Sequence, residues 1–287
     1  MNKETEALEE KKAEWTAIQL DIAQRAVFND HNLSFTVSAD SSAIIGAPNE
    51  PLEPKRQHVQ GTVHGLHTVG GLDISFFKNN PDEAIATLTV LSFPSMDVIH
   101  SISSKICLDA PYIPSFLSMR EASHFVALVD ELRTARSEQI PFPQVFLIDG
   151  NGRLHERQAG LATVVGVQAG VATIGCAKDY HPPHCQDSRI PEWHKTQKGF
   201  KSMCRNILKK RGEWLGILNQ NVSDYAGAAV LTSPHAKAQM PIFISSGHCV
   251  SLDTACVVAL ECCKTSRVPE PVRQADLISR QMVRPNE

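Results

Sequence analysis

Three β-rich runs between residues 68 and 108 restrict the possible folds of this chain more than any other feature. They read TVGGLDISFF (68–77), EAIATLTVLSF (83–93) and DVIHSISSKICL (97–108), and only the short turn sequences KNNPD and PSM separate them. Apolar runs rich in β-branched and aromatic residues, joined by turns this short, predict an antiparallel meander of three strands.

Helical and strand patterns alternate after the meander. A helix is expected over 118–135, and QVFLIDG (144–150) and AGVATIGCA (169–177) are typical of fully buried strands. Further strands are expected at EWLGILNQ (213–220), GAAVLTS (227–233) and PIFISSGH (241–248), and helices over 251–264 and 269–283. This order predicts an α/β fold with a central mixed β-sheet flanked by helices.

The remaining segments complete the organisation. An amphipathic helix is expected over 5–28, an irregular connector over 29–67, and a Pro- and His-rich insertion over 180–212. We expect one catalytic domain over 1–287, with its core at about 12–280 and irregular or flexible segments at 29–67 and 180–198. No apolar stretch approaches the ~18 residues of a membrane helix. The charged first residues lack a secretory apolar region, so we expect the protein in the cytoplasm, the nucleus or both. We also expect it to be monomeric.

Charge is distributed unevenly along the chain. The 287 residues contain 28 Lys and Arg against 31 Asp and Glu, a net charge of −3 that argues against a general nucleic-acid binder. Seven basic residues and no acidic residue lie between Lys195 and Arg211, however, so the rest of the chain carries −10. This segment suits a polyanionic ligand or, equally, a solvated helix face.

The eight cysteines show no disulfide-scaffold spacing, which indicates a reducing compartment with free thiols. The sequence His181-x-x-His184-Cys185 raises a zinc hypothesis, but no second ligand pair follows at a familiar spacing. The two prolines between these histidines favour a loop.

Three acids are candidates for the chemistry. Asp73 lies at the centre of an apolar strand, Asp149 ends a buried strand before a glycine turn, and Glu121 lies near a helix start. Separately, each has an ordinary alternative: a solvent-facing position, a plain tight turn, or a partner of the helix dipole. If they converge, their oxygens form a site that suits Mg²⁺, because three like charges repel strongly without a cation.

Six motifs occur in one order along the chain. They are GGLDISF (70–76), PYIPSFLSMRE (111–121), DGNGRLH (149–155), TIGCAK (173–178), SSGHCVSLDTA (245–255) and PEPVRQAD (269–276). In order and spacing they resemble the endonuclease V family, which has an RNase H-like fold and cuts nucleic acid near inosine. The last motif resembles most the animal branch, which prefers RNA.

This resemblance implies an activity and its metal site. Asp73, Glu121 and Asp149 match the metal-binding carboxylates of a Mg²⁺-dependent hydrolase, in which Mn²⁺ is expected to substitute. The substrate implied is inosine-containing RNA, single-stranded or unpaired, with deoxyinosine DNA as a further candidate substrate. Cleavage is expected at the second phosphodiester 3′ of inosine, giving 3′-hydroxyl and 5′-phosphate ends.

The resemblance also implies roles for other residues. Tyr112, held between Pro111 and Pro114, matches a wedge that fills the gap left by an extruded base. Gly150, Gly152 and Gly175 match the glycine-rich segments around the base pocket. Lys178 matches a phosphate- or water-orienting lysine, His155 and His248 match histidines near the active site, and Asp276 is expected in the outer shell of the metal site.

Two departures from the family pattern bear on activity. Val164 lies where the family usually has a histidine, and Glu156 replaces a proline after His155. An active inosine-specific endoribonuclease is the leading hypothesis, because the three carboxylates, Tyr112 and Lys178 are present. The alternative is a catalytically weakened protein that binds inosine-containing RNA. Without the resemblance, the residues alone indicate only a Mg²⁺-dependent α/β phosphohydrolase.

Overall fold

The computed structural model describes residues 3–38, 57–59, 61–182, 190–219, 224–235 and 240–284. Within these residues, nine strands form one mixed sheet in the order β2-β9-β10-β11-β8-β7-β4-β5-β6. The strands of the sheet are β2 (Gln57–His58), β4 (Thr68–Phe77), β5 (Asn80–Ser92), β6 (Val98–Cys107), β7 (Val145–Ile148), β8 (Thr173–Ala177), β9 (Glu213–Leu218), β10 (Tyr225–Val230) and β11 (Ile242–His248).

The meander forms as predicted. β4 pairs antiparallel with β5, and β5 pairs antiparallel with β6. β7 then runs parallel to β4 on its other side, and β8 runs parallel to β7. The mixed sheet is therefore confirmed, and the pairing brings the carboxyl ends of β4, β7 and β8 to one region of the sheet.

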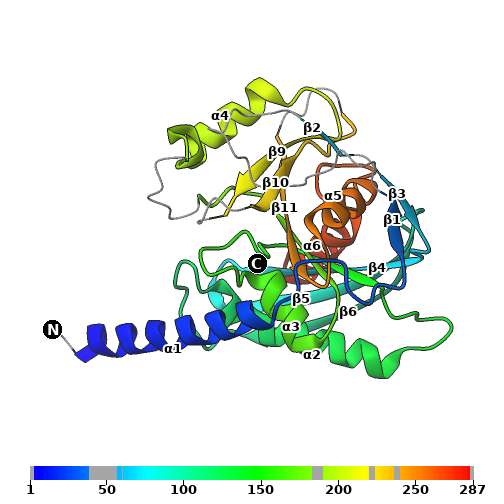
Figure 1. The fold of residues 1–287 in the computed structure, drawn as a ribbon. Coiled ribbons are helices and arrows are strands. Elements are labelled where there is room, and N and C mark those ends of the chain that lie inside the picture. Colours follow the sequence, from blue (N-terminus) through cyan, green and yellow to red (C-terminus); the bar gives the residue numbers. More distant parts are fainter. Residues whose placement is uncertain are drawn as a thin grey trace.

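Helices cover both faces of the sheet (Figure 1). The helices are α1 (Lys3–Arg25), α2 (Leu117–Ala135), α3 (Leu161–Ala169), α4 (Gln197–Ile207), α5 (Leu252–Glu261) and α6 (Glu270–Val283), with a short 3₁₀ turn at Glu192–His194. Apolar residues of α1, α2 and α3 share one buried core with β4, β5 and β7, and α5 and α6 share a second core with the other face. The N-terminal part of α1 projects from the body of the molecule (Figure 1).

Close packing of α6 on β4 depends on one glycine. A Cβ atom on Gly71 would lie 2.1 Å from the backbone carbonyl carbon and oxygen of Pro271. This contact is far inside van der Waals distance, so only glycine lets α6 approach β4 here. The approach carries Asp276, on the same helix, toward the centre of the sheet.

Several expectations need correction. The segment 161–169 forms the helix α3, which was not predicted, and the expected strand over 169–177 begins only at Thr173. The connector over 29–67 is not wholly irregular, because β1 (Thr36–Ser38) pairs with β3 (Thr62–His64) and β2 joins the main sheet. The insertion likewise contains α4. Residues 39–56 and the zinc hypothesis, with His184 and Cys185, lie outside the described residues. Among the described helices, none combines the length and apolar character needed to cross a membrane.

Candidate active site

Parallel pairing of β4 and β7 places two carboxylates side by side. Asp73 is in β4 and only 3% exposed, and Asp149 directly follows β7. The backbone N–H of Asp149 donates to the carbonyl of Leu72 at 3.1 Å, which sets the two acids at neighbouring positions. Both line one cavity of about 710 Å³, and the buried Glu121 of α2 lines it as well.

Two of these carboxyl groups, those of Asp73 and Glu121, resist ionisation. The pKa of Asp73 is raised well above its usual range, mainly by burial. The negative charge of Asp149 and a side-chain hydrogen bond with Asp149 add to this effect. Burial also raises the pKa of Glu121 to about 7, although the Arg120 guanidinium opposes this and the charge of Asp149 adds to it. The cavity therefore holds acids that need a proton or a cation beside them.

Lys178 supplies one positive charge. Its ammonium Nζ lies 2.5 Å from Oδ2 of Asp149. Burial lowers the pKa of Lys178, but the charges of Asp149, Asp73 and Asp276 outweigh it and raise the pKa above its ordinary value. Asp276 of α6 also raises the pKa of Asp73 and is itself paired with Arg280 at 2.8 Å. Asp276 thus lies within electrostatic reach of Asp73 and Lys178 from α6.

The residues present fit a hard divalent cation. Oδ2 of Asp73 is buried without a hydrogen-bond partner, and the second carboxylate is adjacent. Within the part of the chain that the structure describes, no three His, Cys, Asp or Glu side chains form one metal-holding group, so Glu121 shares the cavity without completing a three-carboxylate cluster. One or two carboxylates with retained water and substrate phosphate are the ligands typical of Mg²⁺.

The loop before α2 carries Tyr112, the residue that the resemblance predicts to act as a wedge. Tyr112 is 67% exposed and lines the cavity with Pro114, whereas Pro111 is exposed and lies off the cavity wall. Gly150 lines the cavity on the opposite loop. Gly152 and Gly175 instead lie against each other, because a Cβ on Gly175 would meet the backbone nitrogen of Gly152 at 2.5 Å. These two glycines let the loop after β7 rest directly on β8.

The chain matches the family model for endonuclease V over residues 52–277. This match spans most of the chain. The chain belongs to the endonuclease V family. It is 36% identical to human endonuclease V over 220 residues, which is 77% of this chain and 73% of the human protein.

Solved structures of the endonuclease V family share the architecture. A crystal structure of Ciona intestinalis endonuclease V with DNA containing an inosine followed by a ribo-adenosine superposes with a TM-score of 0.76 at 30% identity, covering 97% of this chain and 100% of that chain. The human catalytic domain superposes at 0.74, with 30% identity and coverage of 100% and 98%. The RNase H-like fold is therefore confirmed, and the protein is a nuclease that hydrolyses phosphodiester bonds. Nucleases of the endonuclease V family are generally metal-dependent.

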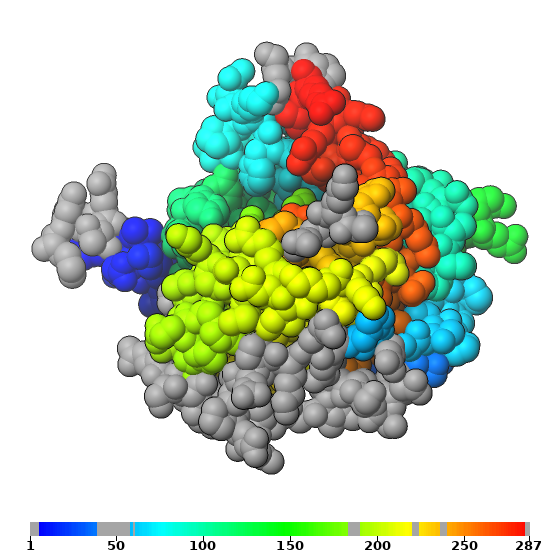
Figure 2. Space-filling model, turned by 90° about the horizontal axis from the view of Figure 1, so that it is seen from above, coloured from blue at the N-terminus to red at the C-terminus, as the bar shows by residue number. Residues whose placement is uncertain are grey.

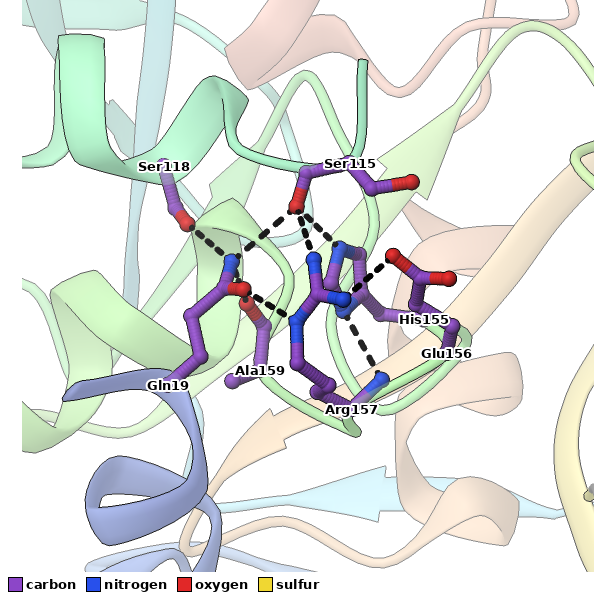
Figure 3. A network of polar contacts seen from close by, with 7 residues as sticks. All are labelled: Gln19, Ser115, Ser118, His155, Glu156, Arg157 and Ala159. Carbon is purple, nitrogen blue, oxygen red and sulfur yellow. Dashed lines mark hydrogen bonds and ion pairs between the residues drawn. The ribbon is translucent and has the colours of Figure 1, made fainter. Parts of the chain in front are cut away.

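The structure separates the two histidines that the resemblance assigned to the site. His155 lines the cavity, but burial and the charge of Arg157 lower its pKa to about 4, so it is neutral at physiological pH. Its Nε2–H donates to the Ser115 carbonyl at 3.0 Å, and its Nδ1 accepts from the Arg157 backbone (Figure 3). His248 lies off the cavity wall, where its Nδ1 accepts from the Val27 backbone at 3.2 Å. Neither imidazole is placed as a cation for phosphate.

Both departures from the family pattern have a structural account. Val164 is fully buried in α3 and belongs to the apolar core. Glu156 is ion-paired with Arg157 at 2.6 Å. The position of the missing histidine is therefore filled by apolar packing.

Some residues of the cavity were not identified from the sequence. Phe76 is 42% exposed at the end of β4. Together with Leu117 it adds apolar surface to the cavity that Tyr112 also lines. An exposed Phe76 cannot be distinguished from the buried Phe77 by pattern alone. Lys195 also lines the cavity, as the first residue of the basic segment.

The basic segment divides into two groups. Lys198 and Arg205 are exposed on α4, which lies on the face of the molecule seen in Figure 2. Lys201 is paired with Asp179 at 2.7 Å. Arg211 instead donates to the carbonyls of Leu260 and Cys263 at 2.7 and 3.1 Å and so stabilises the end of α5. Only part of the segment is available to a polyanion.

Proposed function

We propose that this protein is an endoribonuclease that cleaves inosine-containing RNA where the inosine is single-stranded or unpaired, with deoxyinosine DNA as a second substrate. Cleavage at the second phosphodiester 3′ of inosine, giving 3′-hydroxyl and 5′-phosphate ends, is part of the proposal. The observation that carries it is the buried Asp73, with its unpartnered Oδ2, beside the part-buried Asp149 in a cavity that the exposed Tyr112 also lines.

Aromatic side chains at this cavity support recognition of a nucleobase. Exposed Tyr112 and Phe76 provide aromatic faces for nucleobases, and stacking of a base on such a ring contributes about 1–3 kcal/mol. Similarity to the Ciona enzyme, which is bound to DNA with an inosine followed by a ribo-adenosine, supports inosine and a ribonucleotide beside it. The relationship to human endonuclease V supports the RNA preference of the animal branch.

Asp73 and Asp149 would hold Mg²⁺, or Mn²⁺ in its place, with Glu121 on the same wall. Such an ion lowers the pKa of water and stabilises the charge on the phosphate during displacement. In the reaction a water oxygen bonds to phosphorus, the bond from phosphorus to the 3′-oxygen breaks, and that oxygen takes a proton. A cation in the cavity would lower the pKa of Glu121 from its metal-free value of about 7, so that its carboxylate would be available to accept a proton from the attacking water. Lys178 offers its charge to a phosphate oxygen from beside Asp149.

The test is an end-labelled RNA with one internal inosine, compared with the same RNA carrying adenosine and with the deoxyinosine DNA. Cleavage two phosphodiesters 3′ of inosine, lost in EDTA, restored by Mg²⁺ or Mn²⁺ and absent in Asp73→Asn, supports the proposal. Equal cutting of the adenosine RNA would refute it.

The second candidate function is an inosine-RNA-binding protein with weakened catalysis. Val164, which replaces the family histidine, favours it. Tight, inosine-selective binding without cleavage by the unmodified protein would select this alternative.

We further propose that the protein acts as a monomer in the cytoplasm or nucleus. The cysteines of the described residues are all free thiols, which suits a reducing compartment. Sedimentation of the purified protein and imaging of a tagged chain test these two points.

A further inference from the structure

One backbone carbonyl near the cavity is held by three side chains. The Ser115 carbonyl accepts from Gln19 Nε2 at 3.2 Å, from His155 Nε2 at 3.0 Å and from Arg157 Nη2 at 2.8 Å (Figure 3). Ser115 has a φ of +68°, a left-handed conformation that costs a non-glycine residue on the order of 1–3 kcal/mol. The surrounding donors therefore maintain a backbone shape that the loop would not adopt by itself.

Arg157 is the centre of this arrangement. Besides Ser115, its guanidinium donates to Oε1 of Gln19 at 2.5 Å and is paired with Glu156 at 2.6 Å. Its carbon lies 4.3 Å from the ring centroid of Phe116, the residue after Ser115. The planar guanidinium thus contacts the loop through both a hydrogen bond and a ring face, a combination that lysine cannot reproduce.

Gln19 connects α1 to the same loop. Its side chain is fully buried and its amide also donates to Ser118 Oγ at 3.0 Å and to the Ala159 carbonyl at 3.3 Å. Trp15, one turn earlier, packs on Phe116 with ring centroids 5.7 Å apart. Residues of α1 therefore lie against the loop, although α1 precedes the segment that matches the family model.

The held loop is the one that carries Tyr112, three residues before Ser115. Tyr112 itself is 67% exposed, so its place at the cavity rim is set by the backbone on either side of it. A wedge that fills the gap of an extruded base must be in position before the base leaves, since disorder in the loop would add to the cost of unstacking.

We propose that Gln19 and Arg157 are positioning residues that fix the Tyr112 loop for the extrusion of inosine from a base stack. This inference rests on the proposed function of the same cavity. The pair matters most where the inosine is unpaired but stacked within a duplex, as in a mismatch, because extrusion from the stack costs a few kcal/mol and a single-stranded inosine requires less. The acid pair at Asp73 and Asp149 lies apart from these contacts, so chemistry on an accessible inosine is retained.

The experiment compares kcat/KM on two RNAs of the same sequence, one single-stranded and one with the inosine in a duplex. Arg157→Lys keeps the charge and loses the planar contacts, and Gln19→Met keeps the volume and loses the amide. Each is expected to lower kcat/KM on the duplex about tenfold or more relative to the single strand. In a Tyr112→Ala background, neither substitution should change this ratio further, because the wedge they position is already gone.

Arg133→Lys is the matched control. Arg133 of α2 makes the same kinds of contact, with the Asp130 carboxylate, the Ala169 carbonyl at 2.7 Å and the Phe142 ring, but away from the cavity. It should lower thermal stability about as much as Arg157→Lys and leave the duplex-to-single-strand ratio unchanged. Equal losses on both RNAs for Arg157→Lys, or a ratio that still changes in Tyr112→Ala, would overturn the inference.

A second readout separates this inference from the proposed function. A 2-aminopurine beside the inosine of the duplex reports unstacking by fluorescence in EDTA, without cleavage. Wild type should raise the fluorescence and Arg157→Lys should not, even if the protein binds inosine without cutting it. Equal unstacking by both proteins would reject the positioning role while leaving the cleavage result intact.

Discussion

Replacing Glu121 by Gln should stabilise the metal-free protein at alkaline pH while it impairs the enzyme. Glu121 is 5% exposed and its pKa is about 7 instead of the ordinary 4.5, because burial outweighs the help of Arg120 and Asp149 adds repulsion. At 1.36 kcal/mol per pH unit, this difference corresponds to about 3 kcal/mol of unfolding free energy.

The sign follows from which state binds the proton more tightly. The folded protein holds the Glu121 proton up to pH about 7, whereas the unfolded chain releases it near 4.5. Its stability contribution is therefore complete below pH 4.5 and is lost as the pH rises through 7. Gln carries no charge at either pH, so Glu121→Gln should gain about 3 kcal/mol relative to wild type between pH 4 and pH 8.5.

Urea unfolding in EDTA at these two pH values measures the difference. Subtracting wild type from Glu121→Gln cancels the titration of Asp73, which both proteins share. Glu192→Gln is the control, since the side chain of Glu192 is 87% exposed and its removal should leave the pH dependence unchanged. If Glu121→Gln is less stable than wild type at pH 8.5, the Glu121 carboxylate is ionised and well paired, and the reasoning fails.

Three further predictions address the cation beside the acids, the basic helix and the packing of α6. Lys178→Met should lower kcat on inosine RNA about tenfold or more, because the charge that Lys178 offers to the phosphate is lost; a shift to a lower Mg²⁺ requirement checks the electrostatic cause, since the carboxylates lose a competing cation. A triple alanine variant of exposed or part-exposed basic residues should flatten the salt dependence of RNA binding by about two in log–log slope, measured by fluorescence anisotropy. The substituted residues are Lys198, Lys201 and Arg205. Gly71→Ala should cost several kcal/mol of stability in urea, on the order of an overpacked core, since its Cβ meets the Pro271 backbone.

The sequence predicted the sheet well because the strands differ from their surroundings in composition. β4 and β5 are long runs with many apolar and β-branched residues, β6 alternates apolar and polar residues, and short turn sequences separate the three. Asp73 interrupts the first run, and Asp149 ends the apolar run of β7. α3 was missed for the opposite reason. Seven of its nine residues are buried, so LATVVGVQA is apolar all round and lacks the stripe that identifies a surface helix.

The environment of the site could not be predicted in the same way. Glu121 follows the start of α2 closely, and in sequence it is indistinguishable from a solvated partner of the helix dipole; only the fold shows that it is buried. The contacts of Gln19 with Ser115 and Arg157 join residues 96 and 138 positions apart, and ordinary polar side chains carry no periodic signal for such pairing. Arg211 carries the same charge as its neighbours in the basic segment, but it donates a hydrogen bond to the Leu260 carbonyl at the end of α5.

The features that destabilise this protein are concentrated around one cavity. Asp73 has a buried oxygen without a hydrogen-bond partner, and burial raises the pKa of Glu121 because its charged form is disfavoured. Ser115 has a left-handed backbone conformation. Each would be removed by selection for stability alone, since Asn, Gln and Gly at these positions relieve the strain. Arg157 and Lys178, the cations that offset part of this cost, contact the loop and the acid pair respectively. On the proposed function, the acids would gain stability when a divalent cation binds, and the loop would hold Tyr112 in place before the substrate arrives.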